Sequence, residues 1–566
     1  MATSEAYQEL RKRCEGRLAG LRVNRYSFWA FWSEIALYWL PRRYKWLITP
    51  NQASRGSDIN QRIINNTGVV AARTLAGGLQ GGLTNPMTPW FKFKIQGYED
   101  ESSNVVQWLA ECAKRMQLVF QESNFYNAMA VMYWDLIVFG TAVVLIYEDY
   151  DNVINCYNPC LGEFYTDVSH RLENNVVYRE FVRTIEQIVS EFGIENCPDD
   201  VKRAYDEGGV SWTRERVLIH ALEPNVAPTP LSRIFKYREV YWVAGSGRSE
   251  ILRCKGYHEF PGFVVRWDTV GNDSYGRSSV MDAHGDNKQL QQEEKRKAQG
   301  IDKMVNPPMV ASIEMQNRPA SGLPGGVTYV AGLSRERPGF APAYQVMPNV
   351  AELRQDINAI ENRIKATLFN NLFMDISNLQ TVRSATEIEA RREEKLLMLP
   401  VIKRLDKEAL APAIERVWAI MMRGGLFPPD MPPEVRGQLI SVKYISAFAM
   451  AMLAAETTAI ERLYSFGGNL AAAFAKAGGQ PDALDNFDSD SAIHIYGDAI
   501  GADPRVLRKD SDRDAMRQAR AQQQQSAQAM QNAGQAVQGA QVLSQTPVGG
   551  GQNALERVLG GGQGAL

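Results

Sequence analysis

Residues 282–304 form a helix-compatible stretch that is almost entirely polar. It carries five basic and five acidic side chains and therefore no net charge. A long helix that is polar on all sides cannot sit in an ordinary hydrophobic core, because it has no apolar face to bury. Its charges would be satisfied if copies of the chain surrounded a water-filled channel, with neighbouring subunits on one side and solvent on the other.

A Pro/Gly-rich insertion and a second helix follow this stretch. Residues 305–349 hold seven prolines and five glycines, which predicts a loop-like segment with a short strand at 327–330. Five apolar residues then repeat at spacings of 4, 3, 4 and 4, which predicts an amphipathic helix: Leu353, Ile357, Ile360, Ile364 and Leu368. Two interpretations are open, a helical hairpin that carries a surface loop and one wall of a channel.

The charge balance of both helices bears on what a channel could conduct. Residues 351–372 carry three basic and three acidic side chains, so this segment is neutral like 282–304. Phosphates are bound by cations that displace counterions. A wall without net charge would let a duplex slide rather than grip it.

The N-terminal half of the chain predicts helices followed by strands. Residues 1 to about 135 show helical spacings, with an exposed first helix and an aromatic helix that ends at Pro41. Between 140 and 270, β-branched runs alternate with turn residues, which predicts a strand-rich part with one helix near Ile185–Phe192. The fold class predicted for the whole chain is α+β, mainly α, with an elongated subunit.

The C-terminal half is predicted to be helical. Its longest helical pattern opens near residue 386 and runs to Arg423, with bends at Pro400 and Pro412. Another helix spans roughly Ala447–Tyr464. A charged helix and a Gln/Ala-rich tail follow Gly501.

Composition limits the class of protein. The chain has 566 residues and a mass of 63.3 kDa, enough for two to four domains or one elongated subunit. Lys plus Arg is 62 and Asp plus Glu is 64, whereas a free-standing nucleic-acid binder would usually carry a basic surplus. Six cysteines are too sparse for a disulfide scaffold and favour synthesis in a reducing cytosol. The most apolar early stretch, Phe28–Leu40, is too short to cross a membrane, so no membrane partner is expected.

No pattern of catalytic or metal-binding residues stands out in the sequence. It holds no Gly-Lys dipeptide, so it lacks a P-loop, and it holds no HExxH, GxSxG or GxGxxG motif. Cys156 and Cys160 are the only close cysteine pair, and no second pair completes a zinc site. The five histidines are scattered. We therefore expect no catalytic residue, no metal and no cofactor, and the chain is predicted not to be an enzyme.

Several short motifs follow one another along the chain in a fixed order that can be compared with known families. Ile35-Ala36-x-Tyr38-x-x-Pro41 is followed by a helix at 71–79 and the aromatic turn Pro89-Trp90-Phe91. Asp273-Ser274-Tyr275-Gly276-Arg277-Ser278 then precedes the polar helix, which ends at Asn306-Pro307. Thr386-Glu387-Ile388 and Ile500-Gly501-x-Asp503 complete the series. In this order and spacing, from about Ile35 to Arg520, the chain resembles the head-to-tail connector (portal) proteins of short-tailed, T7-like bacteriophages.

The resemblance implies a ring, usually of twelve subunits, at one vertex of the capsid in the virion. Double-stranded DNA would be packaged and ejected through this ring, and the packaging ATPase (terminase) would be a separate protein. Tail adaptor and tube proteins, capsid proteins and scaffolding proteins are the other implied partners, and synthesis would take place in the bacterial host cytoplasm. The implied parts are an N-terminal wing (1–281), a first stem helix (282–304), a clip (305–350), a second stem helix (351–372), a tunnel loop (373–385), a further wing part (386–500) and a crown with a Gln/Gly-rich tail (501–566).

The same resemblance assigns candidate site residues. The tunnel loop would face DNA through Asn378, Gln380, Thr381, Arg383 and Ser384, although a tight surface turn between antiparallel helices is the alternative. Stem and subunit contacts are expected at Lys288, Lys295, Arg296, Lys297, Leu353, Ile357, Ile360 and Ile364. Partner binding by the clip is expected at Arg318, Arg335 and Arg337, and the motif turn comprises Tyr275, Gly276, Arg277 and Ser278. Two rival functions remain, an oligomeric scaffold or adaptor without a DNA channel and an enzyme of unfamiliar fold.

Overall fold

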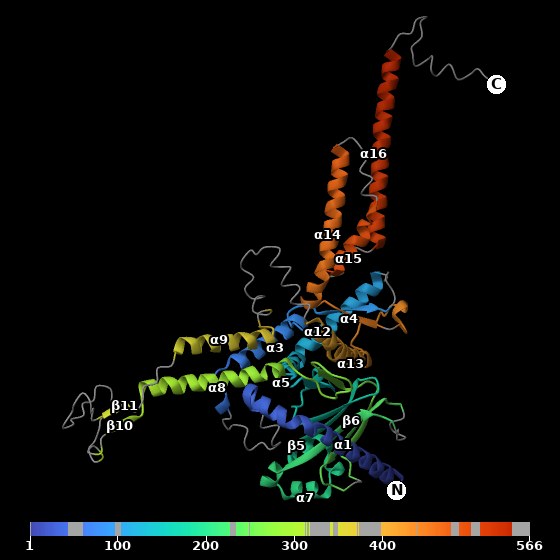
Figure 1. Cartoon of the computed structure of the whole chain (residues 1–566). Coiled ribbons are helices and arrows are strands. Elements are labelled where there is room, and N and C mark those ends of the chain that lie inside the picture. The colour runs from blue at the N-terminus through green and yellow to red at the C-terminus, as the bar shows by residue number, and fades with distance from the viewer. Residues whose placement is uncertain are drawn as a thin grey trace. The chain divides into compact units, whose positions relative to one another are not determined.

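The structure is a computed structural model of the chain (Figure 1). It describes residues 2–43, 60–96, 103–226, 234–247, 250–311, 313, 316, 340–342, 349–370, 372, 398–438, 440–445, 447–476, 486–499 and 510–545. The chain divides into a larger unit (Met1–Lys92, Cys112–Pro429 and Val442–Met452) and a smaller unit (Phe93–Glu111, Asp430–Ser441 and Leu453–Leu566). The predicted fold class, α+β and mainly α, is confirmed.

Helices make up most of the described chain. Those numbered up to α9 are α1 (Ala2–Trp39), α3 (Thr67–Leu83), α4 (Ser103–Glu122), α5 (Phe125–Phe139), α6 (Ile185–Phe192), α7 (Asp199–Glu207), α8 (Ser279–Val305) and α9 (Val350–Thr367). The later ones are α12 (Leu399–Leu405), α13 (Ala411–Arg423), α14 (Ala447–Lys476), α15 (Ser489–Ala499) and α16 (Asp510–Gln545). Short 3₁₀ turns lie at Asn60–Arg62, Ile194–Asn196, Gly209–Thr213 and Pro433–Val435.

Two antiparallel sheets form the strand-rich part that the sequence predicted between 140 and 270. The larger sheet has five strands, each paired with the next along the chain: β4 (Phe164–Val168), β5 (Asn174–Thr184), β6 (Glu215–Pro224), β7 (Tyr237–Val243) and β8 (Arg253–Tyr257). The smaller sheet has the order β3-β2-β9, with β3 at Val153–Tyr157, β2 at Thr141–Asp149 and β9 at Gly262–Arg266. Two-stranded ladders join β1 (Phe91–Ile95) to β12 (Ile440–Tyr444) and β10 (Met309–Ala311) to β11 (Phe340–Pro342).

Helix α6 shows how local sequence sets these boundaries. Its predicted range, Ile185–Phe192, is confirmed at both ends. The Thr184 hydroxyl accepts a hydrogen bond from the Gln187 N–H at 3.3 Å, and the Gln187 side chain accepts one from the Thr184 N–H at 3.2 Å. This reciprocal capping box satisfies two backbone donors at the helix start.

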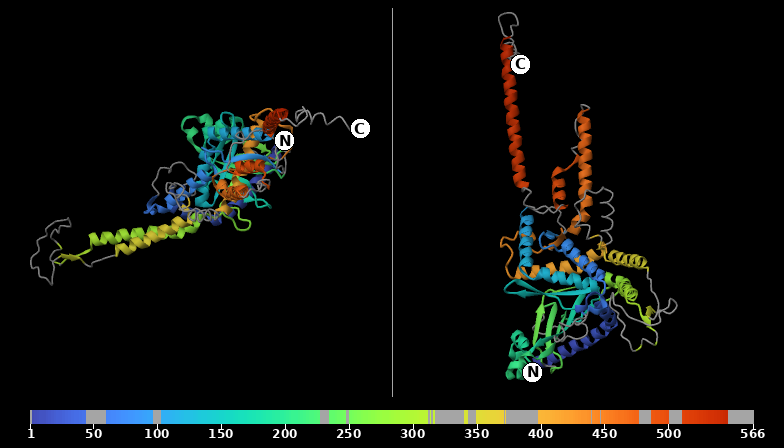
Figure 2. Two further views of the ribbon diagram at one scale, coloured as in Figure 1. Left: turned by 90° about the horizontal axis from the view of Figure 1, so that it is seen from above. Right: turned by 90° about the vertical axis from the view of Figure 1, so that its left-hand side faces the viewer.

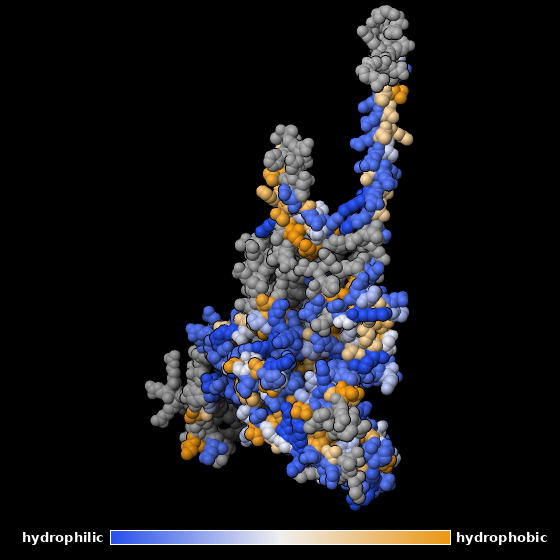
Figure 3. Space-filling view, turned by 90° about the vertical axis from the view of Figure 1, so that its right-hand side faces the viewer, coloured by the Kyte–Doolittle hydropathy of each residue, from blue (hydrophilic) through white to orange (hydrophobic). Residues whose placement is uncertain are grey.

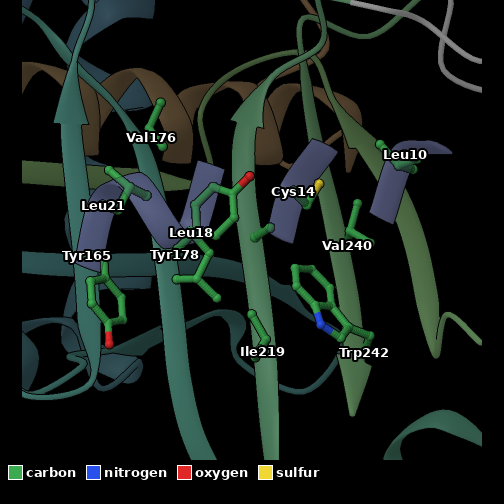
Figure 4. Packing of buried hydrophobic residues seen from close by; sticks show 11 residues of the cluster. Leu10, Cys14, Leu18, Leu21, Tyr165, Val176, Tyr178, Ile219, Val240 and Trp242 are labelled. Atoms are coloured by element: carbon green, nitrogen blue, oxygen red, sulfur yellow. The ribbon is translucent and has the colours of Figure 1, made fainter. Parts of the chain in front are cut away.

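Helix α1 covers the five-stranded sheet (Figure 4). Leu10, Cys14, Leu18 and Leu21 lie on one helix face and pack against strand residues that include Tyr178 and Trp242. The sequence predicted an exposed helix here, and that prediction is wrong for this face. The four apolar residues are spaced so that they share one face, but the many polar residues between them make the segment look exposed. Burial of these four side chains is favourable by about 25 cal/mol for each Å² of apolar surface.

The helical pattern that ends at Arg423 was predicted to bend at Pro400 and Pro412, but the structure interrupts it between these two prolines. Its start near residue 386 lies outside the described residues. Pro400 and Pro412 each stand in the first turn of a helix, α12 and α13, where a missing N–H costs little. The break between these helices is a π-helical turn, Asp406–Leu410, directly before α13.

The smaller unit contains the C-terminal helices. Helix α14 continues twelve residues past the predicted end at Tyr464. Arg517 of α16 pairs with Asp490 of α15 through two bonds of 2.6 Å, and the Tyr496 hydroxyl of α15 donates to Glu461 of α14 at 2.8 Å. These contacts hold the base of α16 to α15 and α15 to α14.

Candidate functional site

The candidate site is a hairpin of two helices in the larger unit, α8 and α9. They lie side by side in Figures 1 and 2. Asp286, near the start of α8, pairs with Arg363, near the end of α9, at 3.1 Å, so the two helices run antiparallel. The β10–β11 ladder pairs Met309 with Pro342, within the segment that connects the helices. The predicted helices at 282–304 and 351–372 correspond to α8 and α9, although α9 ends at Thr367.

The apolar face of α9 is buried within the same chain. Ile357, Ile360 and Ile364 are buried, Leu353 is half-buried, and Leu368 is buried just beyond the helix end. The amphipathic spacing in the sequence is therefore confirmed. Whether these side chains also contact a neighbouring subunit stays a prediction.

The start of α8 is fixed by the motif turn. Ser278 is its N-cap: the hydroxyl accepts a hydrogen bond from the Met281 N–H at 3.1 Å and donates to the Val138 carbonyl at 3.0 Å. The Arg277 N–H donates to the Asp268 carbonyl at 2.8 Å, and its side chain pairs with Asp282 at 2.8 Å. The cap therefore ties α8 to the end of α5 while Arg277 ties the turn to the segment after β9.

Tyr275 anchors the other side of the same turn. Its ring is buried against Phe28 and Trp32 of α1, with ring centroids 5.3 and 5.0 Å apart. Its hydroxyl oxygen accepts a hydrogen bond from the Thr166 N–H at 3.2 Å. Burial raises the pKa of this phenol, so it stays protonated. One aromatic side chain thus links α1, β4 and the start of α8.

Gly276 completes the turn through a close backbone approach to Gly140. Gly140 caps α5 in the left-handed conformation, with φ of 74°. A Cβ atom on either glycine would come within 3.0 Å of the other's carbonyl oxygen. The Gly276 N–H also donates to the Thr141 hydroxyl at 2.7 Å. This site needs two glycines because no side chain fits between the two backbone segments.

One face of the first half of α8 carries polar side chains that are buried, which corrects the prediction of a helix that meets water or neighbours on every side. His284, Asn287 and Gln291 are buried against the chain's own N-terminal segments. The Trp39 indole N–H donates to His284 at 3.2 Å, and the Asn287 amide donates to the Tyr38 carbonyl at 3.2 Å. Buried polar groups are tolerated when they find hydrogen-bond partners, and α1 supplies the partners in these two bonds.

Gln291 makes the most extensive of these contacts. Its side-chain oxygen accepts hydrogen bonds from the backbone N–H groups of Ile64 and Asn65, at 2.7 and 2.8 Å, and its amide donates to the Asn65 carbonyl at 2.8 Å. The Asn65 amide in turn donates to Glu361 of α9 at 2.9 Å. The segment before α3 is therefore hydrogen-bonded to both helices of the hairpin, to α8 through Gln291 and to α9 through Glu361.

Lys288, predicted as a subunit contact, pairs with its own chain. Its ammonium lies 2.6 Å from the Glu34 carboxylate of α1. The hydrogen bond from Lys288 lowers the pKa of Glu34, and the carboxylate raises the pKa of Lys288. Lys288 is exposed and Glu34 is half-buried at the surface, so the pair is a surface salt bridge.

The second half of α8 differs from the first. From Gln292 to Val305 none of its residues is buried, and Lys295 and Arg296 are exposed. Lys297 pairs with Glu294 one turn earlier, at 2.6 Å. Counted over their full lengths, α8 carries five bases and five acids and α9 three of each. The exposed part of the hairpin is thus charged but balanced.

The remaining predicted site residues lie outside the described parts of the chain. These are the tunnel-loop residues Asn378, Gln380, Thr381, Arg383 and Ser384, the clip residues Arg318, Arg335 and Arg337, and the predicted strand at 327–330. Their roles stay predictions.

The sequence did not reveal the residues that hold the base of the hairpin. Only the structure shows that the motif turn contacts Gly140 and that the hairpin contacts Trp39 and Asn65. One signal was present for Gly140, because a glycine directly after an apolar helical run is typical of a C-cap. Asn65 has one local partner, the Thr67 N–H at 2.9 Å, but its partners in the hairpin, Glu294 and Glu361, are more than two hundred residues away.

The described residues contain neither a candidate metal site nor a candidate membrane span. No group of three or more His, Cys, Asp or Glu side chains in these residues could hold a metal ion. Among the described helices, none has the length and apolarity needed to span a bilayer.

Comparison with known proteins gives one consistent result. Residues 11–507 match the family described as bacteriophage head to tail connecting protein. The probable portal protein of Bordetella phage BPP-1 is 36% identical over 530 residues, which cover 92% of this chain and 93% of the relative. The portal protein of Salmonella phage epsilon15 is 37% identical over 539 residues, or 94% of each chain.

Proposed function

Because this chain belongs to the bacteriophage head to tail connecting protein family, we propose that copies of it form a ring at one capsid vertex. Double-stranded DNA is packaged into the head and later ejected through this ring. The ring has twelve subunits, as the family resemblance implies. Portal proteins connect head and tail, and this chain acts as such a connector rather than as an enzyme.

The observation that best supports a channel is the contrast between the two halves of α8. Its first half is fixed to the subunit by buried hydrogen bonds from Asn287 and Gln291, while its second half is exposed. An exposed helix with balanced charges suits a surface that meets neighbouring subunits through ion pairs. The absence of net charge on α8 and α9 suits a wall past which a polyanion moves without being held.

The other parts follow from this assignment. The α8–α9 hairpin is the stem, residues 305–350 are the clip, and 373–385 form a tunnel loop that narrows the channel around the duplex. The clip, through Arg318, Arg335 and Arg337, is the surface for the packaging ATPase and then for the tail. Capsid and scaffolding proteins contact the wing, and residues 501–566 form the crown.

An image of the purified protein tests the proposal. Negative-stain particles of the full chain should be rings with a central hole, and native mass spectrometry should give the mass of twelve chains of 63.3 kDa. Discs without a hole would favour the rival function, an oligomeric scaffold or adaptor that passes no DNA. Monomers in all conditions, together with nuclease or nucleotide-hydrolysis activity, would favour an enzyme.

A further inference from the structure

The larger unit contains a cavity of about 660 Å³ beside the motif turn. Its walls come from α1, from the turn between β4 and β5 and from the loop before α8. A cavity of this size can hold a small ligand or an anchoring side chain of a partner. Figure 3 shows orange atoms in several separate places on one face of the molecule, so exposed apolar side chains alone do not mark a site. The cavity is a stronger indication, because it brings polar groups and apolar walls together in one place.

Hydrogen bonds within the chain hold the walls of this cavity in place. The guanidinium of buried Arg266 donates to the carbonyl oxygens of Leu172 and Asp273, at 2.9 Å each. These two residues lie on opposite sides of the cavity lining, in the β4–β5 turn and in the loop before α8. The Ser274 hydroxyl also donates to Asp167 at 3.3 Å and joins the same loop to the end of β4. The cavity is therefore formed before anything enters it.

The charge of the lining selects the kind of ligand. Of the described residues that line the cavity, Asp167 and Asp273 carry carboxylates and none is Lys or Arg. Arg17 lies 3.8 Å from Asp167, although its nearer partner is Glu223 at 3.1 Å. Among the described residues, the Asp273 carboxylate has neither a hydrogen bond nor an ion pair. The cavity therefore favours a cation and disfavours phosphates.

Aromatic and aliphatic side chains supply the apolar part of the lining. Phe28 of α1 and Tyr275 of the motif turn both line the cavity, with ring centroids 5.3 Å apart. Aromatic rings attract organic cations through their faces. Val23 and Leu172 line the cavity as well and are 74% and 49% exposed. Such walls suit a cation that is carried on an aliphatic chain.

Leu172 has a backbone conformation that leucine rarely adopts. Its φ is 61°, in the left-handed region that favours glycine. Its N–H donates to the Ser169 carbonyl at 2.9 Å, and its own carbonyl accepts from Arg266. A glycine would fit this backbone better, so the leucine side chain at the cavity is not explained by the turn itself.

A metal ion fits this lining less well than an organic cation. In the part of the chain that the structure describes, no group of three or more His, Cys, Asp or Glu side chains could hold a metal ion. An ammonium group needs fewer carboxylates, because it has three N–H donors that also bond amide and hydroxyl oxygens. Asn24 and Ser27 of α1 bring such oxygens to the lining.

We propose that this cavity binds a primary ammonium group carried on an aliphatic chain. Asp273 pairs with the ammonium group, and Val23, Phe28 and Leu172 enclose the chain. Two sources present this chemistry, a free aliphatic diamine and the lysine side chain of a partner protein. The site goes beyond the proposed channel, because neither ring formation nor passage of DNA requires it.

Isothermal titration calorimetry of the full chain with cadaverine, a free aliphatic diamine, tests the site. Asp273→Asn should weaken binding roughly tenfold, because it removes a charge-assisted hydrogen bond. Asp151→Asn removes the same charge from the exposed turn between β2 and β3, which does not line the cavity, and should bind like the wild type. The neutral diol analogue of cadaverine should give no binding heat.

A second variant separates binding from folding. Leu172→Gly removes an apolar wall but suits the positive φ. It should weaken cadaverine binding about fivefold, while the thermal unfolding temperature of the free chain does not fall. Unchanged binding in this variant would overturn the placement of the aliphatic chain against Leu172.

The peptide acetyl-Leu-Lys-Leu-amide distinguishes the two sources. Both outcomes uphold the site: binding of the peptide at least roughly tenfold tighter than cadaverine assigns it to a lysine of a partner protein, and any smaller advantage assigns it to a free amine. Equal affinities of the wild type and Asp273→Asn for both probes would overturn it, as would the absence of binding by either probe. Imaging the same samples shows whether rings are present, so failure of this site is distinguishable from failure of the ring.

Discussion

Gly140 and Gly276 approach so closely that neither position has room for a side-chain carbon. This contact joins the end of α5 to the turn that starts α8. It is therefore the point at which the base of the hairpin is most sensitive to a small change in volume.

We expect Gly140→Ala to lower the free energy of unfolding by about 2–4 kcal/mol, because alanine would clash with Gly276 and would be strained at the positive φ of this position. Chemical denaturation followed by circular dichroism measures the change. Gly285→Ala is the matched control, since Gly285 lies in α8 and nothing comes within 4 Å of the place its Cβ would occupy. That variant should be unchanged or slightly more stable. Equal stability of the two variants would show that the close approach is not a constraint.

Replacing Gln291 should loosen the base of the hairpin. Gln291→Leu leaves the N–H groups of Ile64 and Asn65 without their acceptor, which should cost about 1–3 kcal/mol in the free energy of unfolding. Gln292→Leu, one residue further along α8 and exposed, should change it little. Denaturant titration of the two variants makes the comparison, and an equal loss in both would argue against the hydrogen bonds as the cause.

The chain should lose stability between pH 7 and pH 5 through His220. This imidazole is fully buried, stacks on Tyr241 and contacts Glu239 at 3.0 Å, while Arg179 and Arg253 add positive charge nearby. Burial lowers the pKa of His220 from 6.5 to about 4, so between these values the unfolded chain binds a proton that the folded chain does not. Folding is then favoured at pH 7 and weakened as the pH falls, by about 2 kcal/mol at pH 5.

A substitution isolates that contribution. His220→Gln can keep a donor toward Glu239 but cannot take up the proton, so its stability should fall less between pH 7 and pH 5. Exposed His170, replaced in the same way, should leave the pH dependence as it is in the wild type. Denaturation curves at both pH values measure the change in the free energy of unfolding. A change in His220→Gln equal to that of the wild type would refute the role of His220.

Reversing three charges on the exposed half of α8 should prevent ring formation. Lys295→Glu, Arg296→Glu and Lys297→Glu together should leave the helical signal intact while the particle remains smaller than a ring. Each exposed ion pair contributes only about 0–1 kcal/mol, so single reversals can be silent. The matched control, Lys202→Glu, Arg203→Glu and Arg214→Glu, makes the same change of charge on and after α7. This control should still form rings. Rings from the first variant as abundant as from the wild type would show that this part of α8 is not a subunit contact.

Arg383→Ala should leave ring assembly intact and alter the retention of DNA or the length packaged. Arg383 is the one fixed cation in the proposed tunnel loop, and phosphate contacts of this kind position a duplex without reading its sequence. Both quantities are measurable in reconstituted particles. Arg383→Lys preserves the charge and should behave like the wild type. Normal packaging and retention in Arg383→Ala would refute contact with DNA, and loss of the ring would assign the residue a structural role.

Local patterns in the sequence predicted much of the fold. The helix near Ile185–Phe192, the β-branched run of β2 and the apolar spacing of α9 were each predicted from neighbouring residues, and the helix, strand and helix are confirmed. The same holds for the existence of α8, whose predicted range lies within Ser279–Val305.

Features that depend on distant contacts were missed. The composition of α8 suggested exposure on every side, yet Asn287 and Gln291 are buried because α1 and the segment before α3 supply hydrogen-bond partners. Leu10 and Leu18 are buried because a sheet formed more than a hundred residues later provides an apolar surface. No local sequence pattern indicates the hydrogen-bond partners of α8 or the sheet that covers Leu10 and Leu18. The motif turn was recognised by its letters, whereas its physical role depends on Gly140 and Val138.

The strand order of the five-stranded sheet determines when this sheet can form during translation. Each of its strands pairs with the next along the chain, and the longest connection, between β5 and β6, contains α6 and α7, so the pairings are local in sequence and lose little entropy. Strand β2 pairs with β3 directly after it, but its second partner, β9, follows that entire sheet in the sequence. During translation the ribosome therefore releases everything needed for the sheet and its α1 cover before β9, the motif turn and α8 itself. The hairpin therefore folds onto a sheet that is already complete, and a nascent chain has this sheet before it has the helices proposed to meet neighbouring subunits.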